Sequence, residues 1–191
     1  MKEMIRSFVA AEIPESVRAQ VGRLLDRLRR EPGPGVRWVR PGVMHLTLEF
    51  LGEVSGDFVE TAKVQLNRVV PKLKPFEAQL SGLGAFPSST RARVIWVGVE
   101  RGKEDLCRLQ ASMTQALVRI GFKPERRPFS PHLTLGRLNV PADVSAATAV
   151  EFQGDVFAVN EVVLFQSVLT PQGPVYMRLA TFPLGGDGAT A

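Results

Sequence analysis

Hydrophobic positions along the chain follow a helical period in some segments and a strand period in others. From Glu15 to Arg30 apolar residues recur at spacings of four, three, one and three, which predicts an amphipathic helix. Two more helices are predicted over residues 57–70 and 103–120, the second ending at Gly121 as a C′ glycine. Strand patterns predict extended segments over residues 5–13, 36–39, 44–51, 76–86, 93–99, 131–138, 156–169 and 175–182.

Proline and glycine clusters predict the loops between these elements. They fall at residues 32–35, 87–90 and 170–174, of which the second and third join strand pairs as hairpins. Residues 141–149 have no clear period. The small residues of 185–191 are expected to form a mobile tail, so that a single domain occupies residues 1–184.

The sequence His-Leu-Thr-Leu occurs twice, at His45–Leu48 and at His132–Leu135, and these two histidines are the only ones in the chain. The copies lie close to half a chain length apart, and a repeated local pattern usually reflects a repeated structural unit. The sequence therefore predicts an α+β fold with two similar lobes, each an antiparallel sheet with helices outside, and a groove between them.

Within a strand, side chains two residues apart share a face. Each motif therefore places its histidine and threonine on one face and its two leucines on the other, in the core. His45 and His132, facing one groove, would supply the acid and the base for in-line displacement at a phosphodiester. Thr47 and Thr134 would donate hydrogen bonds to the phosphate oxygens, and Arg137 is the nearest candidate cation.

Two other roles for these histidines are a purely structural one and the binding of a metal ion. A single half-exposed strand with histidine and threonine is usually structural, and it is the repetition that favours a functional site. Zinc needs more ligands than two histidines provide, although Glu49, four residues after His45, would add one from the same face. No glycine-rich loop has a nucleotide-binding spacing. We therefore expect neither a metal nor a nucleotide cofactor.

The amino-acid composition says little more about the class of protein, its ligand or its compartment. The 191 residues are 45% hydrophobic and 23% charged, which is ordinary for a globular protein, and the net charge of +5 is compatible with an anionic ligand such as RNA. The single cysteine, Cys107, cannot form an intramolecular disulfide, and no apolar run is long enough to cross a membrane. We expect a cytoplasmic monomer that does not associate with membranes.

The motifs and their flanks resemble the two-histidine (2H) phosphoesterase superfamily, and within it the RNA 2′,3′-cyclic phosphodiesterases, also called 2′-5′ RNA ligase-like proteins. The matching stretches are residues 6–10, 37–39, 45–54 and 127–137. The resemblance implies a bilobal fold with a catalytic groove between duplicated units. It implies hydrolysis of an RNA-terminal or nucleoside 2′,3′-cyclic phosphate to a 2′-phosphomonoester, without metal or nucleotide cofactor. Some relatives also join RNA ends through a 2′-5′ linkage in the reverse direction.

The resemblance also implies a role for each member of the motif pair. His45 and His132 would be the catalytic acid and base. The sequence does not assign which is the acid and which the base; of the two assignments we favour His132 activating water and His45 protonating the departing 3′ oxygen. Thr47 and Thr134 would hold the phosphate.

Two flanking residues complete the expected site. In similar relatives an aromatic residue five positions after the first histidine stacks on the nucleobase, and a basic residue at the same offset after the second contacts phosphate. Phe50 and Arg137 occupy these positions. Regular alternation would place both on the face opposite the histidines, so these roles require a twist, a bulge or a strand end there. For Phe50 a place in the core stays open as the alternative to base stacking, whereas Arg137 is harder to bury, which favours its phosphate role.

Two other functions stay open at this point. The same four motif residues would serve a relative that acts on another small cyclic or 2′-5′ linked nucleotide, because they address phosphate rather than base. The groove of a non-catalytic RNA-binding module would also present them, although binding alone does not need two titratable groups.

Overall fold

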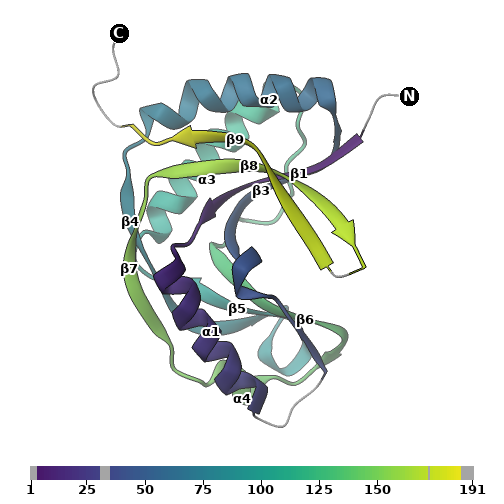
Figure 1. Cartoon of the computed structure of the whole chain (residues 1–191), viewed down its shortest axis with the longest axis vertical. Coiled ribbons are helices and arrows are strands. Elements are labelled where there is room, and N and C mark those ends of the chain that lie inside the picture. The colour runs from purple at the N-terminus through teal and green to yellow at the C-terminus, as the bar shows by residue number, and fades with distance from the viewer. Residues whose placement is uncertain (1–3, 31–34, 172, 186–191) are drawn as a thin grey trace.

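The computed structural model describes residues 4–30, 35–171 and 173–185, and within them the chain forms two antiparallel sheets with helices packed on them (Figure 1). The strands are β1 Met4–Glu12, β2 Val36–Trp38, β3 His45–Ser55, β4 Phe76–Phe86, β5 Ala92–Val99, β6 His132–Ala142, β7 Gln153–Val159, β8 Glu161–Thr170 and β9 Gly173–Pro183. The helices are α1 Glu15–Arg30, α2 Gly56–Val69, α3 Lys103–Val118 and α4 Ser145–Thr148, with 3-10 turns η1 Pro41–Val43, η2 Val70–Lys72 and η3 Ser89–Arg91.

Each motif belongs to a different sheet. The strand order is β3-β1-β8-β9 in the first sheet and β2-β6-β5-β4-β7 in the second. His45 is the first residue of β3, and His132 is the first residue of β6. These two strands contact each other although they belong to different sheets. The two motif strands therefore connect the sheets, and the predicted α+β class with two antiparallel lobes is confirmed.

The helices bury the apolar stripes that the sequence predicts. The buried residues of α1 are Val17, Val21, Leu24, Leu25 and Leu28. This helix contacts β7 of the second sheet, whereas α2 and α3 pack against each other and against β3. Besides the main core, a smaller apolar cluster lies on the first sheet. It consists of Phe8, Ala10, Val163 and Phe165, with Tyr176 packed against them.

The end of α3 follows from one glycine. The N–H of Gly121 donates to the carbonyl of Val118 at 3.0 Å, and the N–H of Phe122 donates to that of Leu117 at 3.1 Å, which is the Schellman pattern. Gly121 has a φ of 94°, where a larger residue would be strained. The predicted C′ glycine is confirmed, and the helix stops at Val118 because the chain tightens into this cap.

One predicted strand is wrong. Residues 156–169 were expected to form the first limb of the final hairpin, but they divide at Asn160 between β7 and β8. β7 pairs with β4 in the second sheet, whereas β8 pairs with β1 and β9 in the first. The strand period continues through Asn160 without a glycine or proline, so the crossing from one sheet to the other leaves no local signal. The β8–β9 hairpin itself is confirmed.

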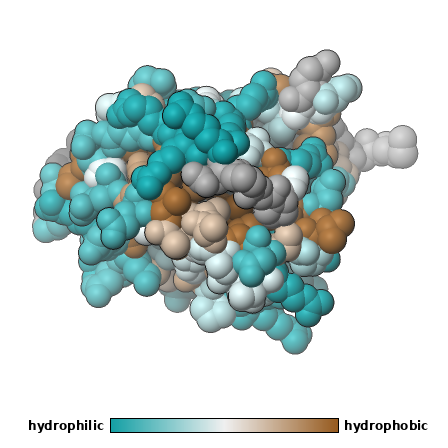
Figure 2. All heavy atoms as spheres, turned by 90° about the horizontal axis from the view of Figure 1, so that it is seen from below, coloured by the Kyte–Doolittle hydropathy of each residue, from teal (hydrophilic) through white to brown (hydrophobic). Residues whose placement is uncertain are grey.

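Several expectations concern the remaining segments. The unassigned residues 141–149 contain the end of β6 and the short α4. The expected loop at 32–35 and tail at 185–191 lie outside the described residues except for Gly35 and Gly185. No helix among the described residues is long and apolar enough to cross a membrane. Seen from below, the surface carries hydrophobic side chains near its centre with hydrophilic ones around them (Figure 2).

Candidate active site

The two motif histidines make the same hydrogen bond. His45 Nδ1 lies 3.0 Å from the carbonyl oxygen of Val43, and His132 Nδ1 lies 2.7 Å from that of Ser130, in each case two residues earlier. A carbonyl oxygen only accepts, so Nδ1 carries the proton of each neutral ring. Nε2 is then the nitrogen that keeps a lone pair for proton transfer. We call each histidine with the threonine and the residues around it a half-site. Both half-sites hold their histidine in the same tautomer, with the proton on Nδ1.

A β-bulge follows the threonine in both motif strands. The register pairs Thr47 with Ala10 and Glu49 with Val9 in the first sheet, and Thr134 with Trp96 and Gly136 with Ile95 in the second. Leu48 and Leu135 are therefore the extra residues, at the same place in each motif. A bulge of this kind places two consecutive side chains opposite one residue of the neighbouring strand and shifts the alternation that follows.

The bulges determine where Phe50 and Arg137 lie. Both residues that follow Thr47 are buried, as are both that follow Thr134, after which Phe50 and Arg137 are exposed. Phe50 and Arg137 have thereby returned to the face that carries the histidine and threonine of each motif. Phe50 is 41% exposed, and the Arg6 guanidinium carbon lies 4.8 Å from its ring centroid.

The same bulge turns Glu49 away from the face of β3 that carries His45. It was expected to share a face with His45, but its side chain is buried on the opposite side of β3, where it accepts hydrogen bonds from Gln110, at 3.0 Å, and from the Thr114 hydroxyl. Burial raises the pKa of the Glu49 carboxyl. Glu49 is therefore not placed to share a metal with His45. In the described part of the chain, no three histidine, cysteine, aspartate or glutamate side chains group as a metal site.

Aromatic rings surround His45. Phe8 stacks on its ring with centroids 4.6 Å apart, and Tyr176 meets it edge-on at 5.2 Å. Burial among these rings lowers the pKa of His45 from 6.5 to about 4, the Val43 carbonyl opposes this shift, and the nearby Arg18 charge adds to it. His45 is therefore neutral near pH 7 in the free protein.

His132 has a similar setting built from other residues. Phe86 meets its ring edge-on with centroids 5.1 Å apart, and the Trp96 ring lies at 6.2 Å. Burial lowers the pKa of His132, the hydrogen bond to Ser130 opposes this, and the Arg137 charge lowers it further. Arg137 is thus close enough to act on the imidazole of its own motif.

Arg137 also connects the two half-sites. The pKa of Tyr176 is raised by burial, and the charge of Arg137 is the main influence that opposes this shift. Tyr176 contacts His45 of the first sheet, whereas Arg137 acts on His132 of the second. Side chains from both lobes are therefore within electrostatic reach of the same guanidinium, which favours the shared groove that the repeated motif predicts.

The sequence analysis missed the aromatic side chains around the histidines. They are Phe8, Phe86, Trp96, Phe165 and Tyr176. Only Phe8 had a signal, since it lies in the matched stretch of residues 6–10. The others reach the site through strand pairing that spans a large part of the chain, and no local pattern marks them.

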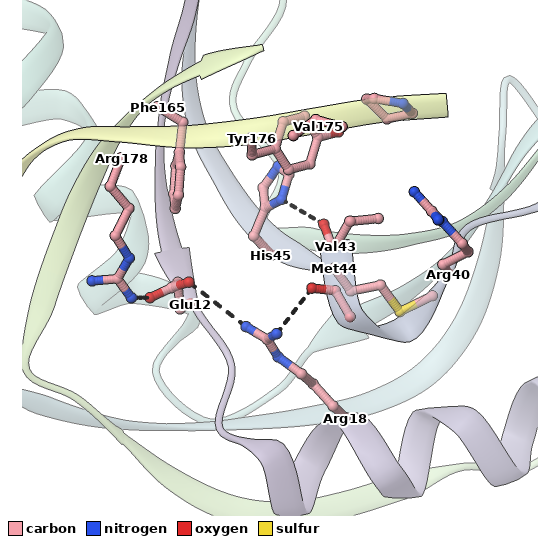
Figure 3. A pocket seen from close by; sticks show the side chains of 12 residues that line it. Glu12, Arg18, Arg40, Val43, Met44, His45, Phe165, Val175, Tyr176 and Arg178 are labelled. Carbon is pink, nitrogen blue, oxygen red and sulfur yellow. Dashed lines mark hydrogen bonds and ion pairs between the residues drawn. The ribbon is translucent and has the colours of Figure 1, made fainter. Parts of the chain in front are cut away.

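A pocket of about 290 Å³ lies beside His45, on the side of Val43 and Tyr176 (Figure 3). Its charged lining residues are Glu12, Arg18, Arg40 and Arg178. Arg18 donates to the Gly42 carbonyl at 3.1 Å and lies 3.7 Å from Glu12, which also pairs with Arg178. Arg18 thereby ties α1 to the η1 turn, whose Val43 carbonyl holds His45. No second-motif residue lines this pocket.

The low pKa of His45 predicts an acid-sensitive fold. Its folded pKa lies below the unfolded value, so the unfolded chain takes up a proton first as the pH falls. The resulting stability is fully present above about pH 6.5 and is lost as the pH falls toward 4, a loss of about 3 kcal/mol from a shift of this size. The difference in unfolding free energy between the wild type and His45→Gln should shrink by that amount between pH 7 and 4 in urea titrations. A difference that is constant with pH would contradict the shift.

The chain is similar to known proteins over nearly its whole length. A family model described as LigT like Phosphoesterase matches residues 11–96 and again residues 97–176, one match for each motif. The RNA 2′,3′-cyclic phosphodiesterase of Methanothermobacter thermautotrophicus is 35% identical over 185 residues, which are 94% of this chain and 99% of the relative. That of Aeropyrum pernix is 38% identical over 179 residues, 88% of this chain and 98% of the relative.

Solved structures agree with these matches. The protein TT0787 of Thermus thermophilus superposes with a TM-score of 0.84 at 31% identity, covering 96% of this chain and 100% of that one. E. coli LigT complexed with 3′-AMP has a TM-score of 0.78 at 28% identity, covering 95% and 99%. Two sheets that each contribute a His-Leu-Thr-Leu strand define a two-histidine phosphoesterase. The chain belongs to the LigT-like phosphoesterase family.

Proposed function

We propose that the protein hydrolyses RNA-terminal or nucleoside 2′,3′-cyclic phosphates to 2′-phosphomonoesters by two-histidine acid–base catalysis, without a metal ion. The matched half-sites carry this proposal: each presents an imidazole with Nδ1 fixed on a carbonyl, followed by a threonine and a bulge. Relatives named RNA 2′,3′-cyclic phosphodiesterase support the substrate class. Reversal of the reaction would join RNA ends through a 2′-5′ linkage.

The pKa of His45 bears on which histidine is the base. Sequence analysis favoured His132 as the base and His45 as the acid. A base must be neutral when substrate binds, and a pKa of about 4 keeps His45 in that form across neutral pH. Burial lowers the pKa of His132 as well, but by less, so His132 takes up a proton more readily, and we propose the reverse assignment. His45 Nε2 accepts a proton from water, the water oxygen attacks phosphorus, and the bond to the 3′ oxygen breaks as His132 donates its proton there.

The remaining groups bind the phosphate and the base. The hydroxyls of Thr47 and Thr134 donate to the two non-bridging oxygens, and Arg137 balances the charge that grows on them. Phe50, exposed on the groove face, offers its ring to the terminal nucleobase. Because the substrate phosphate is an anion, its binding favours the protonated form of His132, which the acid role requires.

The test is hydrolysis in EDTA. Adenosine 2′,3′-cyclic phosphate and an oligonucleotide ending in a 2′,3′-cyclic phosphate are incubated with the protein, and the product isomer is identified by chromatography against 2′- and 3′-phosphate standards. We expect turnover of both to the 2′-phosphate. Binding without turnover would favour a non-catalytic RNA-binding module. Activity only on other cyclic or 2′-5′ linked nucleotides would show that the proposed substrate class is wrong. Loss of turnover in EDTA would exclude the metal-free mechanism.

A further inference from the structure

Two arginines stand directly opposite each other at the edge of the second sheet. The short strand β2 pairs with β6 so that Arg37 faces Arg137. The Val39 N–H donates to the Leu135 carbonyl at 2.8 Å, and by the antiparallel pattern Arg37 and Arg137 are also a hydrogen-bonded pair. The Cα atoms of such a pair lie about 5.5 Å apart, so the two side chains leave the sheet as close neighbours.

The glycine next to Arg137 shows which face they share. A Cβ placed on Gly136 would lie 2.5 Å from Val36 Cγ1 and 3.0 Å from Trp38 Cε3, so Val36 and Trp38 cover the buried face of β6. Alternation then places Arg37, between them, on the opposite face. That face carries Arg137 and the second motif, and both arginines are exposed.

The repulsion between these two arginines lowers the stability of the folded protein unless a negative charge lies beside them. Like charges directly opposite on neighbouring strands are destabilising. Neither Arg37 nor Arg137 forms an ion pair with any residue in the described ranges of the chain. An exposed arginine pair on the face that carries His132 and Thr134 matches the geometry with which guanidinium groups bind phosphate oxygens.

Charge counting indicates more than one phosphate. A 2′,3′-cyclic phosphodiester carries a single negative charge, and Arg137 with the protonated imidazole of His132 already supplies two positive charges beside it. A third positive charge from Arg37 raises the excess of positive charge to two, and a second anion bound next to the first lowers it to one again. In an RNA end, the neighbouring anion is the phosphodiester that links the terminal nucleotide to the one before it.

We propose that Arg37 binds this second phosphate, so that the groove favours the cyclic phosphate of an RNA end over that of a mononucleotide. The proposal rests on the proposed function, whose substrate class it narrows. Arg37 takes no part in proton transfer. Its role is to recognise the chain that continues from the reacting nucleotide.

The test compares three substrates on the wild type and Arg37→Gln. They are adenosine 2′,3′-cyclic phosphate, the dinucleotide ApA with a terminal 2′,3′-cyclic phosphate, and the same dinucleotide with a neutral methylphosphonate linkage. A charge-assisted contact supports a roughly 10- to 100-fold higher kcat/KM for the charged dinucleotide over the neutral one in the wild type. Arg37→Gln should lose this preference and keep the wild-type rate on the mononucleotide within about threefold.

Arg27→Gln is the matched control, because it removes the same charge from an exposed position of α1. It should keep the preference for the charged linkage. Arg37→Gln should also melt no lower than the wild type, since it relieves a like-charge pair. A melting temperature several degrees lower, with all three rates reduced, would instead mark Arg37 as a structural residue and overturn the proposal.

Other outcomes separate this proposal from the proposed function. Equal loss on all three substrates, without loss of stability, would place Arg37 on the reacting phosphate and overturn the second-phosphate site. Wild-type rates on all three would overturn it as well. If the wild type cleaves none of them, the proposed function fails. In that case the second-phosphate site is tested by measuring how tightly the wild type and Arg37→Gln bind the two dinucleotides. The proposal is overturned if the wild type binds the charged dinucleotide no more tightly than the neutral one.

Discussion

Replacement of either motif histidine by alanine is expected to lower kcat by about 10²- to 10⁴-fold with 2′,3′-cyclic phosphate substrates. In the proposed mechanism each imidazole moves one proton in the same transition state, so the double variant His45→Ala/His132→Ala should be little slower than either single one. The measurement is kcat with adenosine 2′,3′-cyclic phosphate, with circular dichroism to confirm that each variant is folded. Near wild-type kcat in either single variant would remove that histidine from catalysis.

A sulfur leaving group separates the acid from the base. If the 3′ bridging oxygen is replaced by sulfur, the departing thiolate needs little help from an acid, because thiols ionise near pH 8.5. The proposed assignment predicts that His132→Ala recovers most of its lost rate on this substrate, whereas His45→Ala does not. Recovery in His45→Ala alone would restore the first expectation, in which His45 protonates the 3′ oxygen.

Most of what the sequence predicts about the site follows from the repeated His-Leu-Thr-Leu motif. Two identical tetrapeptides imply two equivalent strands, and the structure begins β3 and β6 at His45 and His132 with matching hydrogen bonds. Local periodicity was equally sufficient for α1, which runs from Glu15 to Arg30 as predicted. Both features depend only on residues that are close in sequence.

The bulges could not be predicted from local pattern. A strict period of two places Phe50 and Arg137 with the motif leucines, and Glu49 with His45. The extra residues Leu48 and Leu135 reverse all three placements. A bulge depends on the register with a neighbouring strand, β1 or β5, and that register is set by packing across the sheet rather than by the motif strand's own sequence.

The supporting rings were missed for a related reason. Trp96 reaches His132 because β5 pairs with β6, and its ring lies so close over Gly84 that a Cβ there would overlap it. Tyr176 reaches His45 because β9 follows β8, which pairs with β1. These contacts combine strands that are separated in sequence, and the sequence alone does not say which strands are neighbours.

Removal of the ring beneath His45 is expected to change both stability and titration. Phe8 is 3% exposed and stacks on His45 and Phe165, so Phe8→Ala should lower the unfolding free energy by about 3–5 kcal/mol. Burial is the main cause of the low pKa of His45, and opening a cavity beside the ring should raise that pKa from about 4 toward 6.5. Urea denaturation and NMR titration of the His45 ring protons measure the two effects.

Phe157→Ala is the matched control for this prediction. Phe157 is 6% exposed in the main core on β7, and no ring contact joins it to either histidine among the described residues. It should cost a similar amount of stability and leave the pKa of His45 unchanged. Phe8→Leu, which keeps an apolar side chain of similar size, should cost less than about 1.5 kcal/mol. If the pKa of His45 were the same in Phe8→Ala as in Phe157→Ala, burial by the aromatic cluster would not be the cause of the low pKa of His45.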